Sequence, residues 1–129
     1  MPKHVARFLP DRTPRVEFSE SGDSVTLLHD VLYSDPRGRI WRAPKGAVVD
    51  GASIPRLLWR VIGPPMRGRY MLASIMHDVY CDMGPSGQTS SAEVHRMFYD
   101  AMRTSGVPAF KAWIMWMGVR IGGPRWRKP

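Results

Sequence analysis

Residues 49–56 read Val49-Asp50-Gly51-Ala52-Ser53-Ile54-Pro55-Arg56, and the character of the chain changes across them. Before this stretch the sequence consists of short β-prone runs separated by turn residues, and after it apolar residues recur at helical spacing. Asp and Ser are favoured in the turn and the cap of a strand-to-helix junction, and Pro is favoured at a helix start. The stretch therefore predicts an α+β fold, with a strand-rich N-terminal half and a helical C-terminal half.

The N-terminal half predicts a small antiparallel β meander. Its turns are indicated by Ser21-Gly22-Asp23, by Lys45-Gly46 and by Asp35-Pro36-Arg37-Gly38, in which Pro at the second position and Gly at the fourth suit a type I turn. The expected strands cover residues 16–18, 25–28, 31–33, 40–44 and 47–49.

The C-terminal half predicts three to four helices packed on this meander. The first begins near Pro55, with Ser53 as a candidate cap, and stops at Gly63-Pro64-Pro65. The second covers residues 70–81. Ser90 and Glu93 have the spacing of a capping box, which places a third helix from there to about residue 104. A fourth helix is expected over residues 108–119, and a basic C-terminal tail from about residue 120.

The composition is that of one soluble domain. The chain has 129 residues, of which 43% are hydrophobic, and its formal net charge is +8. A single Cys excludes an intrachain disulfide. The N-terminus lacks the apolar region of a signal peptide, and the best apolar run, residues 112–119, is too short to cross a bilayer. These features predict a protein of the virion or the host cytoplasm.

The adjacent residues His77 and Asp78 are the first candidate site. An imidazole can take up a proton near neutral pH, and a carboxylate can hold a hard cation, so a cleft flanked by both can support general-base catalysis. The alternative is structural, with a hydrogen-bonded, half-buried His77 and a solvated Asp78.

Asp50 is the second candidate. Its carboxylate can accept backbone N–H groups, bind a cation or pair with Arg56, whereas the structural alternative is an ordinary turn before a helix.

His95 is the third candidate, at the border of the apolar stripe of its helix. If the helices bearing His77 and His95 are antiparallel neighbours, the two rings approach each other, and His77, Asp78 and His95 form a metal site with open positions. The structural alternative is again a buried, hydrogen-bonded ring. Cys81 invites a nucleophile interpretation, but a lone Cys in an apolar helix is typical of packing.

The C-terminal region is strongly basic. From residue 101 to residue 129 there are six Lys or Arg residues and no acid, interleaved with Trp113, Trp116 and Trp126. This pattern suits nucleic-acid binding, an anionic partner in a virion or an anionic membrane surface. A helix buried through its Trp residues and rimmed by basic side chains has the same pattern.

Several segments, in this order, resemble a phage- and prophage-associated family of unknown function. The resemblance covers roughly residues 40–126 and rests on residues 49–56, on the His77-Asp78 helix and on the stretch Val94-His95-Arg96-Met97-Phe98-Tyr99-Asp100-Ala101-Met102. Two departures stand out. Many members have Tyr at the position of Cys81, and many have Asp at the position of His95.

The His77-Asp78 helix also looks like the catalytic helix of secreted, calcium-dependent phospholipases. That resemblance implies that His77 is the base for water, that Asp78 is a calcium ligand and that His95 replaces an orienting Asp. A neutral imidazole cannot stabilise an imidazolium as a carboxylate does, and the disulfides of those phospholipases are absent.

Two functions are therefore expected. The first is a phage or prophage accessory protein of the virion, associated with the tail, which acts mainly by binding phage structural proteins. The alternative is a metal-dependent hydrolase that acts on a lipid or cell-wall substrate. It would use a divalent cation, calcium or zinc, with His77, Asp78, Asp50 and His95 as candidate catalytic residues.

Overall fold

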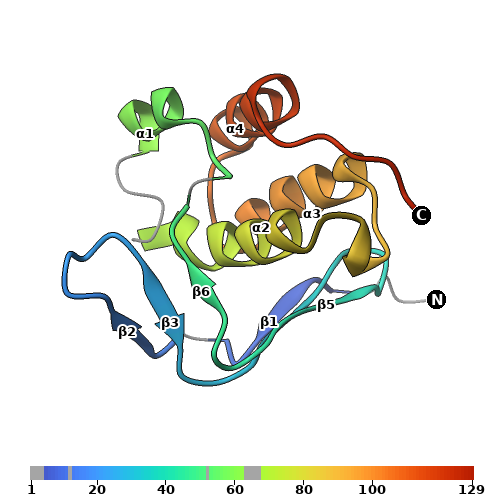
Figure 1. Cartoon of the computed structure of the whole chain (residues 1–129). Helices are drawn as coiled ribbons and strands as arrows, with labels where there is room; N and C mark the ends of the chain where they lie inside the picture. Colours follow the sequence, from blue (N-terminus) through green and yellow to red (C-terminus); the bar gives the residue numbers. More distant parts are fainter. Residues whose placement is uncertain (1–4, 12, 52, 63–67) are drawn as a thin grey trace.

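A computed structural model describes residues 5–11, 13–51, 53–62 and 68–129 of the chain (Figure 1). Strands precede helices in the sequence, which confirms the expected α+β class. The strands of this part of the chain are β1 (Arg7–Leu9), β2 (Val16–Phe18), β3 (Val25–Leu27), β4 (Val31–Ser34), β5 (Ile40–Ala43) and β6 (Val48–Val49). The helices are α1 (Arg56–Ile62), α2 (Met71–Met83), α3 (Ser91–Thr104) and α4 (Ala109–Gly122), with short 3-10 segments at Gly68–Tyr70 and Gly84–Gly87.

The strands are antiparallel, as expected, and they form two three-stranded sheets. The first sheet has the order β1-β4-β5, and the second has the order β2-β3-β6. Strand β1, which the sequence analysis did not predict, pairs with β4 through Phe8 and Tyr33. The chain passes from one sheet to the other between β1 and β2, between β3 and β4 and between β5 and β6, so neighbours in sequence do not all pair.

A buried carboxylate organises the hairpin between β4 and β5. The backbone N–H of Gly38 donates to the carbonyl of Asp35 at 2.9 Å, as the predicted turn requires, and Gly38 has a positive φ of 87°. The Asp35 side chain is buried and accepts backbone N–H groups from Arg37 and Arg39 and the indole N–H of Trp41. Each of these bonds offsets part of the cost of burying the charge.

The helices confirm the expected order, with small shifts at their ends. Helix α2 begins one residue later than predicted and runs two residues further, to Met83. The capping box is present, because Ser90 Oγ accepts the backbone N–H of Glu93 and the Glu93 side chain accepts that of Ser90. The predicted stop at Gly63-Pro64-Pro65 lies outside the described residues. No helix of the described ranges has the length and apolar character that crossing a bilayer requires.

The elements stack in layers. Helices α2 and α3 lie between the sheets and the pair of α1 and α4 (Figure 1). Strands β5 and β6 pack on α2, and Tyr80 of α2 accepts the backbone N–H of Arg42 in β5. The largest fully buried side chains are Trp41, Tyr33, Phe98, Leu27, Ile54, Ile75, Met76, Met97, Met102, Met115 and His77.

The residues after α4 contact the rest of the protein. Trp126 donates its indole N–H to the carbonyl of Thr89 at 2.7 Å, and its backbone exchanges hydrogen bonds with Ser91. The side-chain nitrogen Nζ of Lys128 lies 3.9 Å from Oε1 of Glu93. We call residues 123–129 the C-terminal segment. It covers the start of α3 and brings Pro124 to His95.

Candidate functional site

The loop before α1 is fixed to α2 by one carboxylate. Asp78 accepts the backbone N–H of Asp50 at 3.1 Å on Oδ2 and the backbone N–H of Ser53 at 3.3 Å on Oδ1. Asp78 is 9% exposed, so it is not the solvated charge of the structural alternative. Burial raises the pKa of Asp78, and the hydrogen bonds from Asp50 and Ser53 partly oppose that rise. Asp78 therefore holds the loop that presents Ser53.

Ser53, His77 and His95 form a continuous hydrogen-bonded chain, which we call the relay. Ser53 Oγ lies 3.0 Å from His77 Nδ1, and His77 Nε2 lies 2.9 Å from His95 Nδ1. His95 Nε2 lies 3.0 Å from the carbonyl oxygen of Pro124. The exposed fractions are 8% for Ser53, 0% for His77 and 2% for His95. Ser53 therefore has the largest exposed fraction of the three relay residues.

The carbonyl of Pro124 determines the direction of the relay. A carbonyl oxygen only accepts hydrogen bonds, so we assign the proton of His95 to Nε2. A neutral His95 then has a lone pair on Nδ1, and the proton between the two rings belongs to His77 Nε2. His77 consequently offers a lone pair on Nδ1 to Ser53, whose hydroxyl donates to it. Each donor in this chain meets an acceptor.

Both imidazoles are held neutral. Burial, with a smaller contribution from the neighbouring His95, lowers the pKa of His77 well below the ordinary value of 6.5. Burial also lowers the pKa of His95, and the positive charges of Arg120 and Arg125 add to this effect, while the hydrogen bond to Pro124 opposes it. Neutral rings are the protonation state that the relay requires.

A thiol lies beside the relay. Cys81 follows His77 by one helical turn, and its Sγ lies 3.6 Å from His77 Nε2 and 3.8 Å from His77 Nδ1. One donor atom from each of His77, Cys81 and His95 falls within 4.8 Å of the others. Burial, followed by the negative charge of Asp78, raises the pKa of Cys81 to about 12.

The structure thus brings together His77, Asp78 and His95 from the predicted site, but in distinct roles. Asp50 contributes its backbone N–H, while its side chain is exposed. Asp78 uses both carboxylate oxygens on backbone N–H groups, so the cluster of metal-ligand type consists of His77, Cys81 and His95 instead.

Ser53 is the site residue that sequence reasoning missed. As a serine just before a helix it looked like a cap, but α1 begins at Arg56, which places Ser53 two positions before the N-cap, and its hydroxyl contacts His77. The signal available in the sequence was Ser53 together with a later histidine, although only the fold places the two side chains together.

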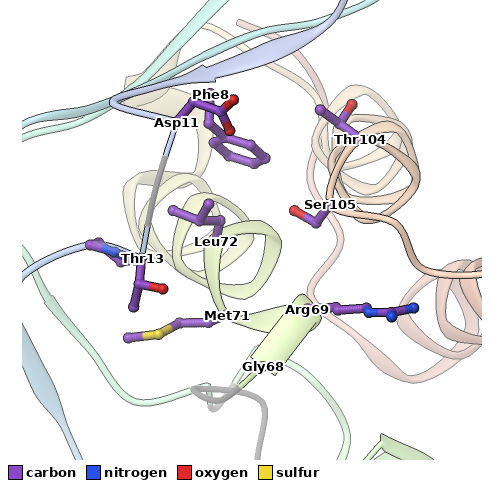
Figure 2. Close-up of a pocket in the computed structure, with 10 residues that line it drawn as sticks. Phe8, Asp11, Thr13, Gly68, Arg69, Met71, Leu72, Thr104 and Ser105 are labelled. Carbon is purple, nitrogen blue, oxygen red and sulfur yellow. The ribbon is translucent and has the colours of Figure 1, made fainter.

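Two of the hollows on the described surface lie against α3. One, of about 670 Å³, lies over the His95 end of the relay, and its wall includes Arg120, Arg125 and Trp126. The other, of about 430 Å³, lies between β1, the start of α2 and the end of α3 (Figure 2). Asp11 and Arg69 line this second hollow together with Ser105, and none of the relay residues does.

Comparison with known proteins places the chain in a family. Residues 25–119 match the family described as "Protein of unknown function (DUF1353)". The chain belongs to this family. The matched part of the DUF1353 protein runs from β3 into α4, and therefore contains Ser53, His77, Asp78, Cys81 and His95. The expectation of a family of unknown function is confirmed.

Two bacterial proteins are similar to the DUF1353 protein. They are "Uncharacterized protein y4jT" and "Uncharacterized protein y4iH" of Sinorhizobium fredii (strain NBRC 101917 / NGR234). They are 42% and 40% identical to it over 100 residues, which is 78% of this chain in both cases. The matched regions cover 29% and 41% of those two proteins, so the chain spans well under half of their length. No solved structure matches the chain.

Proposed function

We propose that this protein is a serine-dependent hydrolase that cleaves an ester or amide bond by acyl transfer. The observation that carries this proposal is the polarity of the relay. A hydroxyl donates to an imidazole lone pair, and the other nitrogen of that imidazole donates to a fixed acceptor. A nucleophile, a base and a group that orients the base are the three parts of a serine-hydrolase triad, which recurs on unrelated folds.

The relay gives each proton a place to go. As Ser53 Oγ attacks the substrate carbonyl carbon, its proton passes to His77 Nδ1, and a tetrahedral intermediate forms. When that intermediate collapses, His77 Nδ1 gives the proton to the departing alcohol or amine, which leaves an acyl ester on Ser53. A water molecule then attacks the ester while His77 Nδ1 takes one of its protons. Ser53 regains a proton from His77 as the carboxylic acid departs.

Two residues position the reacting groups in this proposal. His95 accepts from His77 Nε2 throughout and so keeps the basic Nδ1 turned towards Ser53. Asp78 holds the backbone of Ser53 and so keeps the Ser53 hydroxyl beside His77 Nδ1. Because both oxygens of Asp78 accept backbone N–H groups, the proposal gives Asp78 no role as a cation ligand.

A fluorophosphonate probe tests this function without knowledge of the substrate, because it forms a covalent adduct with an activated serine. We expect mass spectrometry of the digested protein to place the adduct on Ser53. Ser53→Ala should abolish the adduct. His77→Gln should slow labelling by about 10²–10⁴-fold, the usual contribution of a positioned base.

Ser86→Ala is the matched control, because Ser86 is exposed and its described hydrogen bond is to the carbonyl of Met83. Labelling of this variant should equal that of the parent. Thermal melting of every variant shows that the fold is retained. A folded parent that carries no adduct, or carries it on another serine, would contradict the proposal.

The remaining expectations from the sequence stay predictions. These are a lipid or cell-wall substrate, a place in a phage virion, and contacts of the basic surface with phage proteins, nucleic acid or an anionic membrane. If Ser53 is labelled, the substrate prediction should be tested first, by measuring hydrolysis of a panel of lipid esters and peptidoglycan fragments.

A further inference from the structure

We propose that His77, Cys81 and His95 form a Zn²⁺ site, and that zinc bound there switches off the relay. The second half of this proposal rests on the proposed function, whereas the first half does not. The three donors are His77 Nε2, Cys81 Sγ and His95 Nδ1, and all of them come from the adjacent helices α2 and α3.

One of the three ligand–ligand distances matches a tetrahedral zinc ion, one is shorter, and the Cys81 and His95 donors lie within 4.8 Å of each other. With zinc–nitrogen bonds of about 2.0–2.1 Å and a zinc–sulfur bond of about 2.3 Å, two ligands lie about 3.4 Å apart for N and N and about 3.6 Å apart for N and S. Cys81 Sγ lies 3.6 Å from His77 Nε2. The two ring nitrogens lie 2.9 Å apart, so the rings of His77 and His95 need to separate by roughly half an ångström.

The surrounding hydrogen bonds also suit a metal. A metal-bound histidine commonly donates its second ring N–H to a carbonyl or another oxygen. His95 Nε2 already does so to Pro124, and His77 Nδ1 faces the hydroxyl oxygen of Ser53. The hydrogen bonds of the relay leave one proton and one lone pair on each ring, so the thiol is the group that loses a proton on binding.

The donor chemistry selects the metal. Two imidazoles and a thiolate suit zinc, whereas calcium takes oxygen ligands, so calcium is not expected to bind at this site. Three protein ligands leave one position for water. Within the described residues, this is the group of His, Cys, Asp and Glu side chains that has the geometry of a metal site.

Zinc and the relay need the same lone pairs. Zinc at His77 Nε2 replaces the proton between the rings, so a neutral His77 carries its proton on Nδ1 instead. That N–H then donates to Ser53 Oγ, and no lone pair remains there to accept the serine proton. Each zinc ion that binds therefore releases one proton to solvent, and this proton comes from the Cys81 thiol.

The binding half is tested on Ser53→Ala protein, which lacks the nucleophile. Co²⁺ serves as a spectroscopic substitute for Zn²⁺. We expect one equivalent of Co²⁺ to produce a thiolate-to-cobalt absorption band that zinc abolishes by displacement. Adding Cys81→Ser should remove the band and weaken zinc binding at least tenfold, and adding His95→Asn should also weaken it. Adding His29→Ala should change neither, because His29 bonds Arg15 and Asp30 and is no part of the cluster.

The absence of stoichiometric binding, or equal affinity in the Cys81→Ser protein, would overturn the site. The switching half is tested on protein with Ser53 present. Zinc should suppress fluorophosphonate labelling in the parent and leave Cys81→Ser labelled, and a rise in labelling with zinc would overturn the switch. Failure of the parent to label even without zinc would refute the hydrolase proposal and leave the binding result standing, so the two failures are distinguishable.

Discussion

A neutral ring at position 95 sets the strength of the base at His77. His95 Nδ1 accepts the proton of His77 Nε2, but it brings no negative charge to a positively charged His77. Burial of His77 further disfavours its protonated form. The relay therefore has good geometry and a weak base, and a single substitution can separate these two properties.

His95→Asp should strengthen the base. A carboxylate near His77 Nε2 favours the imidazolium and should raise the pKa of His77 by about one to three units. His77 acts as a base in its neutral form, so the acid limb of the labelling rate should move to higher pH, with a faster plateau above it. The pH dependence of fluorophosphonate labelling and the NMR titration of His77 measure both effects. His95→Asn is the uncharged control and should leave the acid limb of the labelling rate at its original pH. An acid limb that does not move in His95→Asp would contradict the relay.

Asp78→Asn tests the clamp on the loop. An Asn side chain keeps one acceptor oxygen and turns an NH₂ group towards a backbone donor, so one of the N–H groups of Asp50 and Ser53 loses its partner. An unpaired buried group of this kind costs about 1–3 kcal/mol. We expect a lower melting temperature and slower labelling of Ser53. Asp82→Asn is the control. Asp82 is an exposed residue one helical turn after Asp78, and none of its described contacts is with a relay residue.

Among the elements, the C-terminal segment is the one that joins the surface to the relay. It supplies the carbonyl of Pro124, which fixes the tautomer of His95 and, through it, that of His77. It is held by Trp126, through Thr89 and Ser91.

Truncation after Gly123 should therefore damage the site from a distance. His95 Nε2–H would lose its acceptor, at a cost of about 1–3 kcal/mol if no other acceptor replaces it. Labelling of Ser53 should slow and the melting temperature should fall. A chain ending at Arg127 keeps Pro124 and Trp126 and, among the described contacts, loses the ion pair of the exposed Lys128 with the half-buried Glu93, so it should behave like the parent. Equal labelling of both truncated chains would exclude a role for Pro124.

Helices were more predictable than strands because their determinants are local. The capping box of Ser90 and Glu93 spans three residues and gave the start of α3 directly. Strand β1 pairs with β4 across more than twenty residues, and no feature of Arg7–Leu9 identifies that partner. The split into two sheets depends on the same non-local pairing.

In the candidate site too, contacts set by helix geometry could be predicted from the sequence, and contacts set by the position of a loop could not. The approach of His77 to His95 follows from two adjacent antiparallel helices, and the structure places the rings together. A lone Cys in an apolar helix favours a packing role for Cys81, although its position four residues after His77 puts both residues on one helix face. The part played by Ser53 depends on where its loop lies against α2, which no local pattern specifies.

For the whole molecule, buried carboxylates tie the layers together. Asp35 accepts from Trp41 and the hairpin backbone, and Arg37 bridges Asp35 to Asp100 of α3. Burial alone would raise the pKa of Asp35, but the hydrogen bonds from Trp41, Arg39 and Arg37 outweigh it and lower the pKa.

The protein should therefore lose stability in acid. The Asp35 pKa is lower in the folded than in the unfolded chain, so its contribution is complete above the unfolded value of about 3.9 and disappears as the pH falls through the folded value. Asp35→Asn should cost about 1–3 kcal/mol at pH 7 and flatten the fall in stability below about pH 4. Urea unfolding at pH 7, 4 and 3 measures both. Asp23→Asn, at an exposed position, is the control; an equal acid response in parent and Asp35→Asn would contradict the assignment.

Cys81 is the single cysteine of the chain, and its sulfur lies against the base of the relay. A thiol-directed reagent can therefore react at one atom only, and that atom is inside the site. Because the thiol is half-buried and its pKa is raised to about 12, alkylation of the closed protein should be slow. The alkylation rate of Cys81 then measures how often the site opens to solvent. A weakly reactive electrophile attached to a substrate-like group would be a selective covalent inhibitor.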